Sequence, residues 1–238
     1  MVYTGVDACR AGWFAVMLGE GREWQAAIFP DIFHLWKHCQ ESKLILIDIP
    51  IGLRQGSSGQ RLCDQEARRL LGGRRSSSVF PVPCREVIYA DRDRADELSR
   101  EITGKGLSRQ SLNIINKIKE VDELLLSNRN ARSRILETHP ELCFWALNGC
   151  VPMKHSKKKR EGFLERMKIL RSFYPCAEEM VHYAGKYYPR GELARDDILD
   201  ALVPAVTASR GGQGMSFLPE KLTLDARGLP MRMAYYLS

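Results

Sequence analysis

The feature that most constrains the fold is an aliphatic segment, Lys43-Leu-Ile-Leu-Ile-Asp-Ile49, which ends at Pro50 and Gly52. A short, nearly continuous run of branched apolar residues is typical of a strand that is buried on both faces. Such a strand requires other strands beside it and helices over both faces of the sheet. The sequence therefore predicts an α/β fold.

The segments before this strand predict the sheet that it joins. Residues 2–9, 13–18 and 24–29 are short, apolar and rich in strand-forming residues, and turns that contain glycine separate them. Three such segments in succession favour an antiparallel meander. Asp31 then stands in the position of a helix N-cap, before apolar residues at helical spacing. The expected order is three strands, a helix and a fourth strand.

The rest of the chain predicts mostly helix, with a fifth strand at residues 134–139 and a hairpin in the tail at 223–236. Residues 54–132 follow the fourth strand, and we interpret them as a helical insertion within a single domain of residues 1–238. The expected helices lie at residues 63–71, 93–102, 108–127, 140–147, 163–173 and 193–209.

The composition excludes several classes of protein. With 238 residues, 44% of them hydrophobic and 27% charged, the chain is typical of a soluble globular protein. No apolar run approaches the roughly 20 residues that span a bilayer, and the N-terminus does not resemble a signal peptide. The seven cysteines have no Cys-x-x-Cys spacing, so we expect reduced thiols. These features predict a cytoplasmic protein that does not bind membranes.

The basic residues are concentrated in two segments. Residues 54–94 contain nine arginines against five acidic residues, and residues 154–171 contain eight basic residues against two acidic ones. A localised positive field favours a polyanionic partner such as nucleic acid, although a solvated surface remains an alternative. The residues expected to bind substrate phosphates are Arg74, Arg75, Arg85, Lys157, Lys158 and Lys159.

The loop that carries these arginines is a candidate wall or lid of the active cleft. Residues 78–85 contain two prolines, and long loops within compact domains are often functional. A structural alternative for the neighbouring segment is an ion pair between Asp64 and Arg68, four residues apart on one helix.

Acidic residues in apolar surroundings are the main candidates for chemistry. Asp7 lies within the first strand and Asp48 near the end of the aliphatic strand, where an ionised carboxylate requires a cation or hydrogen-bond donors. Asp197 and Asp200 share one face of the last helix, where like charges repel. An edge position, a backbone hydrogen bond or helix capping would explain each acid singly. A Mg²⁺ or Mn²⁺ ion would explain them together.

Six motifs resemble domain-of-unknown-function family 429, whose members are predicted ribonuclease H-like nucleases. They are Gly5-Val-Asp-Ala8, Asp48-Ile-Pro-Ile-Gly-Leu53, Ser78-Val-Phe-Pro81, Gly106-Leu-Ser108, Glu137-Thr-His-Pro-Glu141 and Asp196-Asp-x-x-Asp-Ala201. The resemblance covers nearly the whole chain. It implies a ribonuclease H-like mixed five-stranded sheet flanked by helices, in which the first and fourth strands are neighbours and the last helix packs over their carboxylate ends.

This resemblance also implies a function, which is metal-dependent phosphodiester hydrolysis of nucleic acid. Asp7 would bridge two Mg²⁺ or Mn²⁺ ions, and Asp48, Asp197 and Asp200 would complete their ligand shells. Where ribonucleases H carry a glutamate on the first helix, this chain offers only Glu41 near the helix end, so the second metal would rely on Asp48, Asp197 and Asp200 or recruit Glu137 from the fifth strand.

The same residues allow three alternatives. His139 lies two residues after Glu137 and could face the same site, but a partly buried histidine bound to backbone is the favoured interpretation. A catalytically inactive module of the same fold, binding nucleic acid or protein, is the first alternative function. A sugar-kinase or actin-like ATP-binding protein is the second, and it would need a repeated domain that 238 residues without a repeat do not offer.

Overall fold

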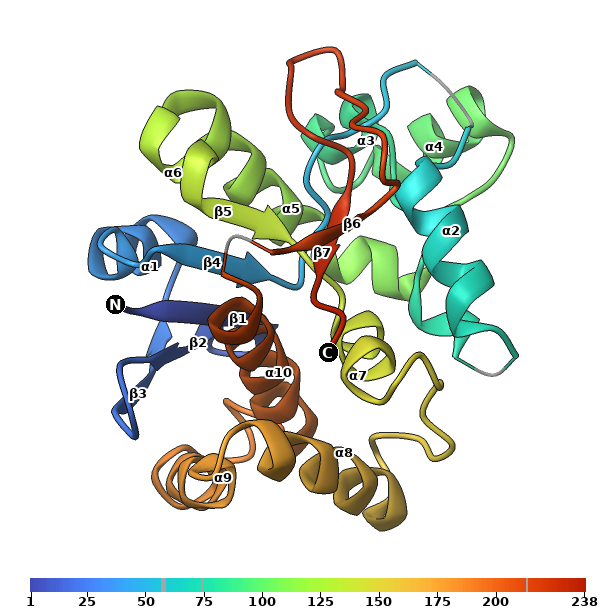
Figure 1. Cartoon of the computed structure of the whole chain (residues 1–238). Helices are drawn as coiled ribbons and strands as arrows, with labels where there is room; N and C mark the ends of the chain where they lie inside the picture. The colour runs from blue at the N-terminus through green and yellow to red at the C-terminus, as the bar shows by residue number, and fades with distance from the viewer. Residues whose placement is uncertain (57–58, 74, 213) are drawn as a thin grey trace.

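A five-stranded mixed sheet forms the centre of the molecule in the computed structural model, which describes residues 1–56, 59–73, 75–212 and 214–238. The strand order is β3-β2-β1-β4-β5 (Figure 1). The first three strands form the expected antiparallel meander, β4 pairs in parallel with β1, and β5 pairs in parallel with β4. The strands are β1 (Tyr3–Cys9), β2 (Gly12–Leu18), β3 (Trp24–Phe29), β4 (Leu44–Ile47) and β5 (Ile135–Glu137).

The register of β1 and β4 brings two predicted acids to one end of the sheet. Val6 pairs with Ile47, and the amide of Asp48 donates to the carbonyl of Val6 at 2.9 Å. Asp7 and Asp48 each directly follow these paired residues. Because the two strands are parallel, both carboxylates lie at the same end of the sheet.

Both faces of the sheet are covered by helices, as the aliphatic run in β4 requires. Alternate residues of β2 divide between the two sides, with Trp13 and Ala15 in one apolar cluster and Phe14 and Val16 in another. The first cluster includes residues of α1 (Ile32–Cys39) and α5 (Arg109–Ser127). The second includes residues of α7 (Pro140–Leu147), α8 (Arg160–Phe173), α9 (Ala177–Tyr187) and α10 (Arg195–Gly211).

The last helix, α10, crosses β1 at Gly5. An ideal Cβ placed on Gly5 would lie 2.2 Å from both the carbonyl oxygen of Ala201 and the amide nitrogen of Ala205. Any larger residue would therefore push the helix away from the strand. This close approach places the first turns of α10 beside the end of β1 that carries Asp7.

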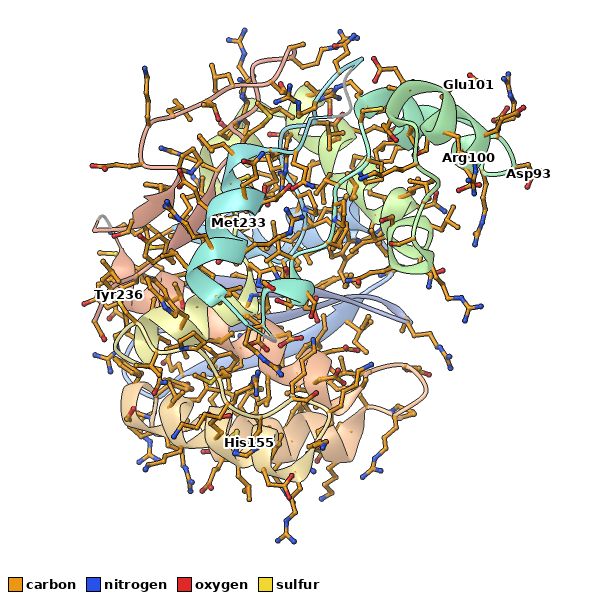
Figure 2. The ribbon with its side chains drawn as sticks, turned by 90° about the vertical axis from the view of Figure 1, so that its right-hand side faces the viewer. Asp93, Arg100, Glu101, His155, Met233 and Tyr236 are labelled. Atoms are coloured by element: carbon orange, nitrogen blue, oxygen red, sulfur yellow. The ribbon has the colours of Figure 1, made fainter. Side chains whose placement is uncertain are left out.

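The segment between β4 and β5 is helical, as expected of an insertion. In addition to α5 it contains α2 (Leu62–Leu71), the 3₁₀ turn η1 (Ser76–Ser78), α3 (Arg85–Tyr89), α4 (Ala95–Thr103) and α6 (Arg129–Arg134). The sequence prediction missed α3 and α6, because five or six residues are too few to show a helical period. Asp93, Arg100 and Glu101 project outward at the α4 end of the molecule (Figure 2).

The C-terminal tail differs from the expected hairpin in its extent. The predicted turn is present, since the amide of Gly228 donates to the carbonyl of Asp225. The two strands that pair with each other, β6 (Ser216–Leu218) and β7 (Met233–Tyr235), lie farther from this turn on either side of it. Within the described residues, no helix has the combined length and apolar character needed to cross a membrane.

Candidate active site

Four predicted acids line one cavity of about 560 Å³. Asp7 comes from β1, Asp48 follows β4, and Asp197 and Asp200 lie in the first two turns of α10. Asp7 and Asp200 are buried, whereas Asp48 and Asp197 are half-buried at the cavity wall. The fold thus brings together side chains that are almost 200 residues apart in the sequence.

Asp7 and Asp48 have no hydrogen-bond donor for their carboxylates within the described part of the chain. Burial raises the pKa of Asp7 well above its usual value, and the charges of Asp48 and Asp200 raise it further. Burial also raises the pKa of Asp48 to about 6, although His139 opposes this rise. Both carboxylates therefore sit in desolvated positions, and neither accepts a hydrogen bond from the residues that the structure describes.

The two acids of α10 are partly compensated. Asp197 accepts a hydrogen bond from the amide of Ala194 at 3.0 Å, and burial nevertheless raises its pKa to about 6. Asp200 accepts a hydrogen bond from the ammonium of Lys157, and burial raises its pKa despite this partner. One oxygen of each carboxylate is therefore already engaged within the protein.

The donor set fits a divalent cation of the Mg²⁺ or Mn²⁺ type. Carboxylate oxygens are hard ligands, and the buried Asp7 has no positive neighbour in direct contact within the described part of the chain. Among the described residues, no three of the four acids offer oxygens within 4.8 Å of one another. Three of these acids could share one ion only if their oxygens moved closer together.

The predicted arginines lie in different places. Arg75 lines the cavity beside Ser77, Ser78 and Phe80, so this part of the predicted loop forms one of its walls. Arg74 lies outside the described residues. Arg85 does not line the cavity.

Arg85 is instead a structural residue, which corrects its predicted role in phosphate binding. Its side chain is buried and forms ion pairs with Asp122 and Asp225, the latter at 2.6 Å. Through these pairs it ties α3 to α5 and to the C-terminal turn.

The three predicted lysines are likewise not equivalent. Lys157 and Lys158 line the cavity, and Lys157 contacts Asp200. Lys159 is the N-cap residue of α8, is exposed and does not line the cavity.

Glu137 does not join the four acids. Its carboxylate accepts from Arg61 Nη2 at 2.7 Å and from the amide of Ile51 at 2.7 Å. Arg61 also binds Asp64 at 2.6 Å, so the alternative pair between Asp64 and Arg68 is wrong. Glu137 therefore faces Arg61 in the insertion, and burial raises its pKa to about 7 although the Arg61 guanidinium opposes this rise.

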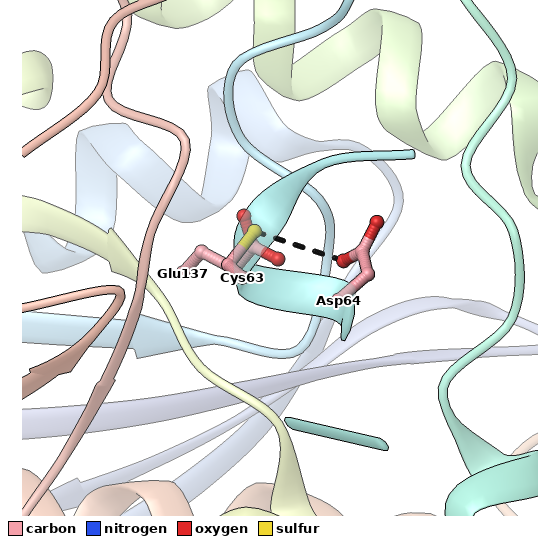
Figure 3. A group of neighbouring side chains, drawn as sticks. All are labelled: Cys63, Asp64 and Glu137. Carbon is pink, nitrogen blue, oxygen red and sulfur yellow. Dashed lines mark hydrogen bonds between the residues drawn. The ribbon is translucent and has the colours of Figure 1, made fainter. Parts of the chain in front are cut away.

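Cys63, Asp64 and Glu137 lie close enough to hold a metal ion (Figure 3). Arg61 binds both carboxylates and thereby occupies the position of a cation. Burial raises the pKa of the Cys63 thiol, which disfavours the thiolate that a metal requires. We therefore interpret this group as a structural ion-pair cluster.

His139 is a cavity residue whose structural interpretation was favoured in the sequence analysis. It is the N-cap of α7 and lines the cavity beside Asp48. Its Nε2 lies 3.4 Å from the carbonyl oxygen of Ser78, and its buried Nδ1 has no partner among the described residues. The signal for its placement was the Pro140 that follows it, because proline starts α7 and fixes His139 at the strand end.

The acid cluster predicts an unusual pH dependence of stability in the absence of metal. The pKa of Asp48 is raised by folding, so its contribution to stability is present below about pH 4 and is lost as the pH rises through about 6. We expect Asp48→Asn to gain stability relative to wild type between pH 4.5 and pH 7.5, by about 1–3 kcal/mol. Urea unfolding of both proteins in EDTA at the two pH values measures this difference. A difference that does not change with pH would contradict the assignment.

Residues 5–223 match the family model described as Protein of unknown function (DUF429), which covers nearly the whole chain. No curated protein and no solved structure matches the chain. The six sequence motifs indicated this same family. The chain belongs to DUF429.

Proposed function

We propose that this protein is a ribonuclease H-like nuclease that uses Mg²⁺ or Mn²⁺ to hydrolyse phosphodiester bonds in nucleic acid. The observation that carries the proposal is the cavity in which Asp7, Asp48, Asp197 and Asp200 meet at the ends of β1 and β4. The buried Asp7 carboxylate, which has no donor within the described residues, is the position most in need of a cation.

The other cavity residues support a nucleotide as the substrate unit. Arg75 and Lys158 offer positive charge for phosphate oxygens, and Phe80 and Ile114 supply an apolar surface for a base. A cavity of about 560 Å³ is large enough for a nucleotide-sized group. Acidic, basic and apolar groups are therefore present together, as a phosphodiester with an attached base requires.

The residues have separate roles in this proposal. Asp7, Asp48, Asp197 and Asp200 hold the metal, which when bound activates water and stabilises the leaving oxygen. The water oxygen bonds to phosphorus, and the bond from phosphorus to the leaving sugar oxygen breaks. The proton of the attacking water passes to solvent. The leaving oxygen takes a proton from solvent.

The placement of the lysines predicts which of them steers the substrate. Lys158→Ala is expected to lower the slope of log affinity against log salt by about one unit, because one phosphate contact is lost. Lys159→Ala removes the same charge outside the cavity and is expected to leave the slope at its wild-type value. Fluorescence anisotropy with a labelled oligonucleotide across a salt series checks both. If both variants changed the salt slope equally, the lysines at 157–159 would act only as a general surface charge.

The experiment that tests the proposed function is a substrate panel. Single-stranded DNA and RNA, duplexes, hybrids and branched junctions are incubated with the protein and Mn²⁺, with Asp48→Asn as the inactive control. Cleavage by wild type that is abolished in EDTA and in Asp48→Asn supports the proposal. Binding without cleavage of any substrate would instead identify an inactive nucleic-acid-binding module.

A further inference from the structure

Lys157 is placed inside the acid cluster. Its ammonium donates to Asp200 Oδ2 and lies 3.9 Å from Asp196 Oδ2. Its side chain is 34% exposed, and Lys157 lines the same cavity as Asp7 and Asp48. A lysine in a surface loop normally extends into solvent, whereas this one is directed at buried carboxylates.

The backbone that carries Lys157 is held by hydrogen bonds to α8. The Glu165 carboxylate accepts from the amide of Lys154 at 2.9 Å and from the amide of His155 at 3.0 Å. Arg166 Nη1 donates to the carbonyl of His155 at 3.0 Å. His155 lies beside α8 at the lower side of the molecule (Figure 2). The segment before Lys157 is therefore fixed at two successive residues.

Two further features make this support specific. Gly162 allows α8 to approach the segment, since an ideal Cβ there would lie 2.0 Å from the carbonyl oxygen of Ser156. Arg166 is fully buried and forms an ion pair with Glu141 of α7. A buried charged network and a glycine contact thus set the position from which Lys157 reaches Asp200.

Protein donors already engage several of the carboxylate oxygens that could bind a second metal ion. Glu137 is engaged by Arg61 and by the amide of Ile51. Asp200 gives one oxygen to Lys157, and Asp197 gives one to the amide of Ala194. Among the acids that line the cavity, Asp197, Asp200 and Glu141 each keep one oxygen free, whereas Asp7 and Asp48 have both carboxylate oxygens free of protein donors within the described residues. This set is sufficient to anchor one ion.

We propose that Lys157 is a built-in cation of the acid cluster, which takes the place of one of the two expected metal ions. The site then holds one divalent ion per chain, anchored by Asp7 and Asp48. The Lys157 ammonium supplies, on the Asp200 side, the positive charge that a second ion would supply. This inference rests on the proposed function and specifies the number of ions that the site uses.

The test is a Mn²⁺ titration of the full chain, with free Mn²⁺ measured by electron paramagnetic resonance. We expect wild type to bind one Mn²⁺. We expect Lys157→Met to bind it with a Kd lower by roughly tenfold or more, because removing a unit charge close to a divalent ion has such an effect even with water-like screening. Lys157→Arg keeps the charge and should keep the wild-type Kd. Lys159→Met removes a charge outside the cavity and should also keep it.

Two ions bound by wild type, or an unchanged Kd in Lys157→Met, would overturn the inference. The stoichiometry of wild type tests it even if the methionine variant does not fold. If wild type binds two ions and cleaves nucleic acid, this inference fails while the proposed function stands. If wild type binds no Mn²⁺ and cleaves nothing, the proposed function fails and this inference fails with it.

Discussion

Arg61→Met is expected to lower the free energy of unfolding by about 3–5 kcal/mol, since it leaves buried carboxylates without their partner. Arg61 is 2% exposed and contacts both Asp64 and Glu137, at 2.6 Å and 2.7 Å. Its Nη1 also donates to the carbonyl of Ile51 at 3.0 Å. Methionine fills similar space but supplies no donor to any of these groups. Urea denaturation of wild type and variant measures the loss.

An exposed ion pair provides the matched control. Arg100 pairs with Asp96 at 3.1 Å within α4, and its side chain is 66% exposed. Arg100→Met should therefore cost less than about 1 kcal/mol. If Arg61→Met cost no more than Arg100→Met, the cluster of Arg61, Asp64 and Glu137 would not be the structural ion-pair cluster described here.

Asp7→Asn is expected to reduce the rate of nucleic-acid cleavage by at least about 100-fold, because bound metal supplies several kcal/mol of transition-state stabilisation and each 1.4 kcal/mol is a factor of ten. Asp7 is the most central acid, since the charges of Asp48, Asp200 and Asp197 all act on its carboxyl. The protein should still fold, because the amide removes charge repulsion. Single-turnover cleavage of the substrate found in the panel measures the rate.

Glu161→Gln is the control for this variant. Glu161 lies in the first turn of α8 and does not line the cavity. The rate should remain within a few-fold of wild type, as is usual when the altered side chain does not contact the reacting groups. An Asp7→Asn protein that cleaved at the wild-type rate would remove Asp7 from the site.

The strands and long helices could be predicted because each has a local physical signal. The aliphatic run of β4, the glycine turns of the meander and the Asp31 cap of α1 all correspond to elements of the structure. The helix α9 was missed, although its buried residues Ala177, Met180 and Ala184 lie at helical spacing. Short elements such as α3 are fixed by tertiary contacts that no local pattern records.

The acids of the site could be predicted because a buried carboxylate requires a cation or hydrogen-bond donors. That argument identified Asp7 and Asp48 and led to Asp197 and Asp200, which the structure places on one cavity. It could not separate Glu137 from this group.

The limits of this argument come from partners that are distant in sequence. The Arg61 that compensates Glu137 lies 76 residues earlier in the chain. Within the run of Lys157, Lys158 and Lys159, the residues are chemically identical, and only the contacts with α8 decide which one reaches the acids.

Thermal melting with and without Mn²⁺ tests the metal-binding cluster most directly. We expect Mn²⁺ at about 100 times its Kd to raise the Tm of wild type by roughly 5–10 °C through mass action. Asp7→Asn and Asp48→Asn should melt at or above wild type without metal and should lose most of the shift with it. Structural carboxylates would give the opposite pattern, since losing charge-assisted hydrogen bonds costs about 1.5–3 kcal/mol. Two asparagine variants that melt well below wild type, with no protein responding to Mn²⁺, would contradict the account.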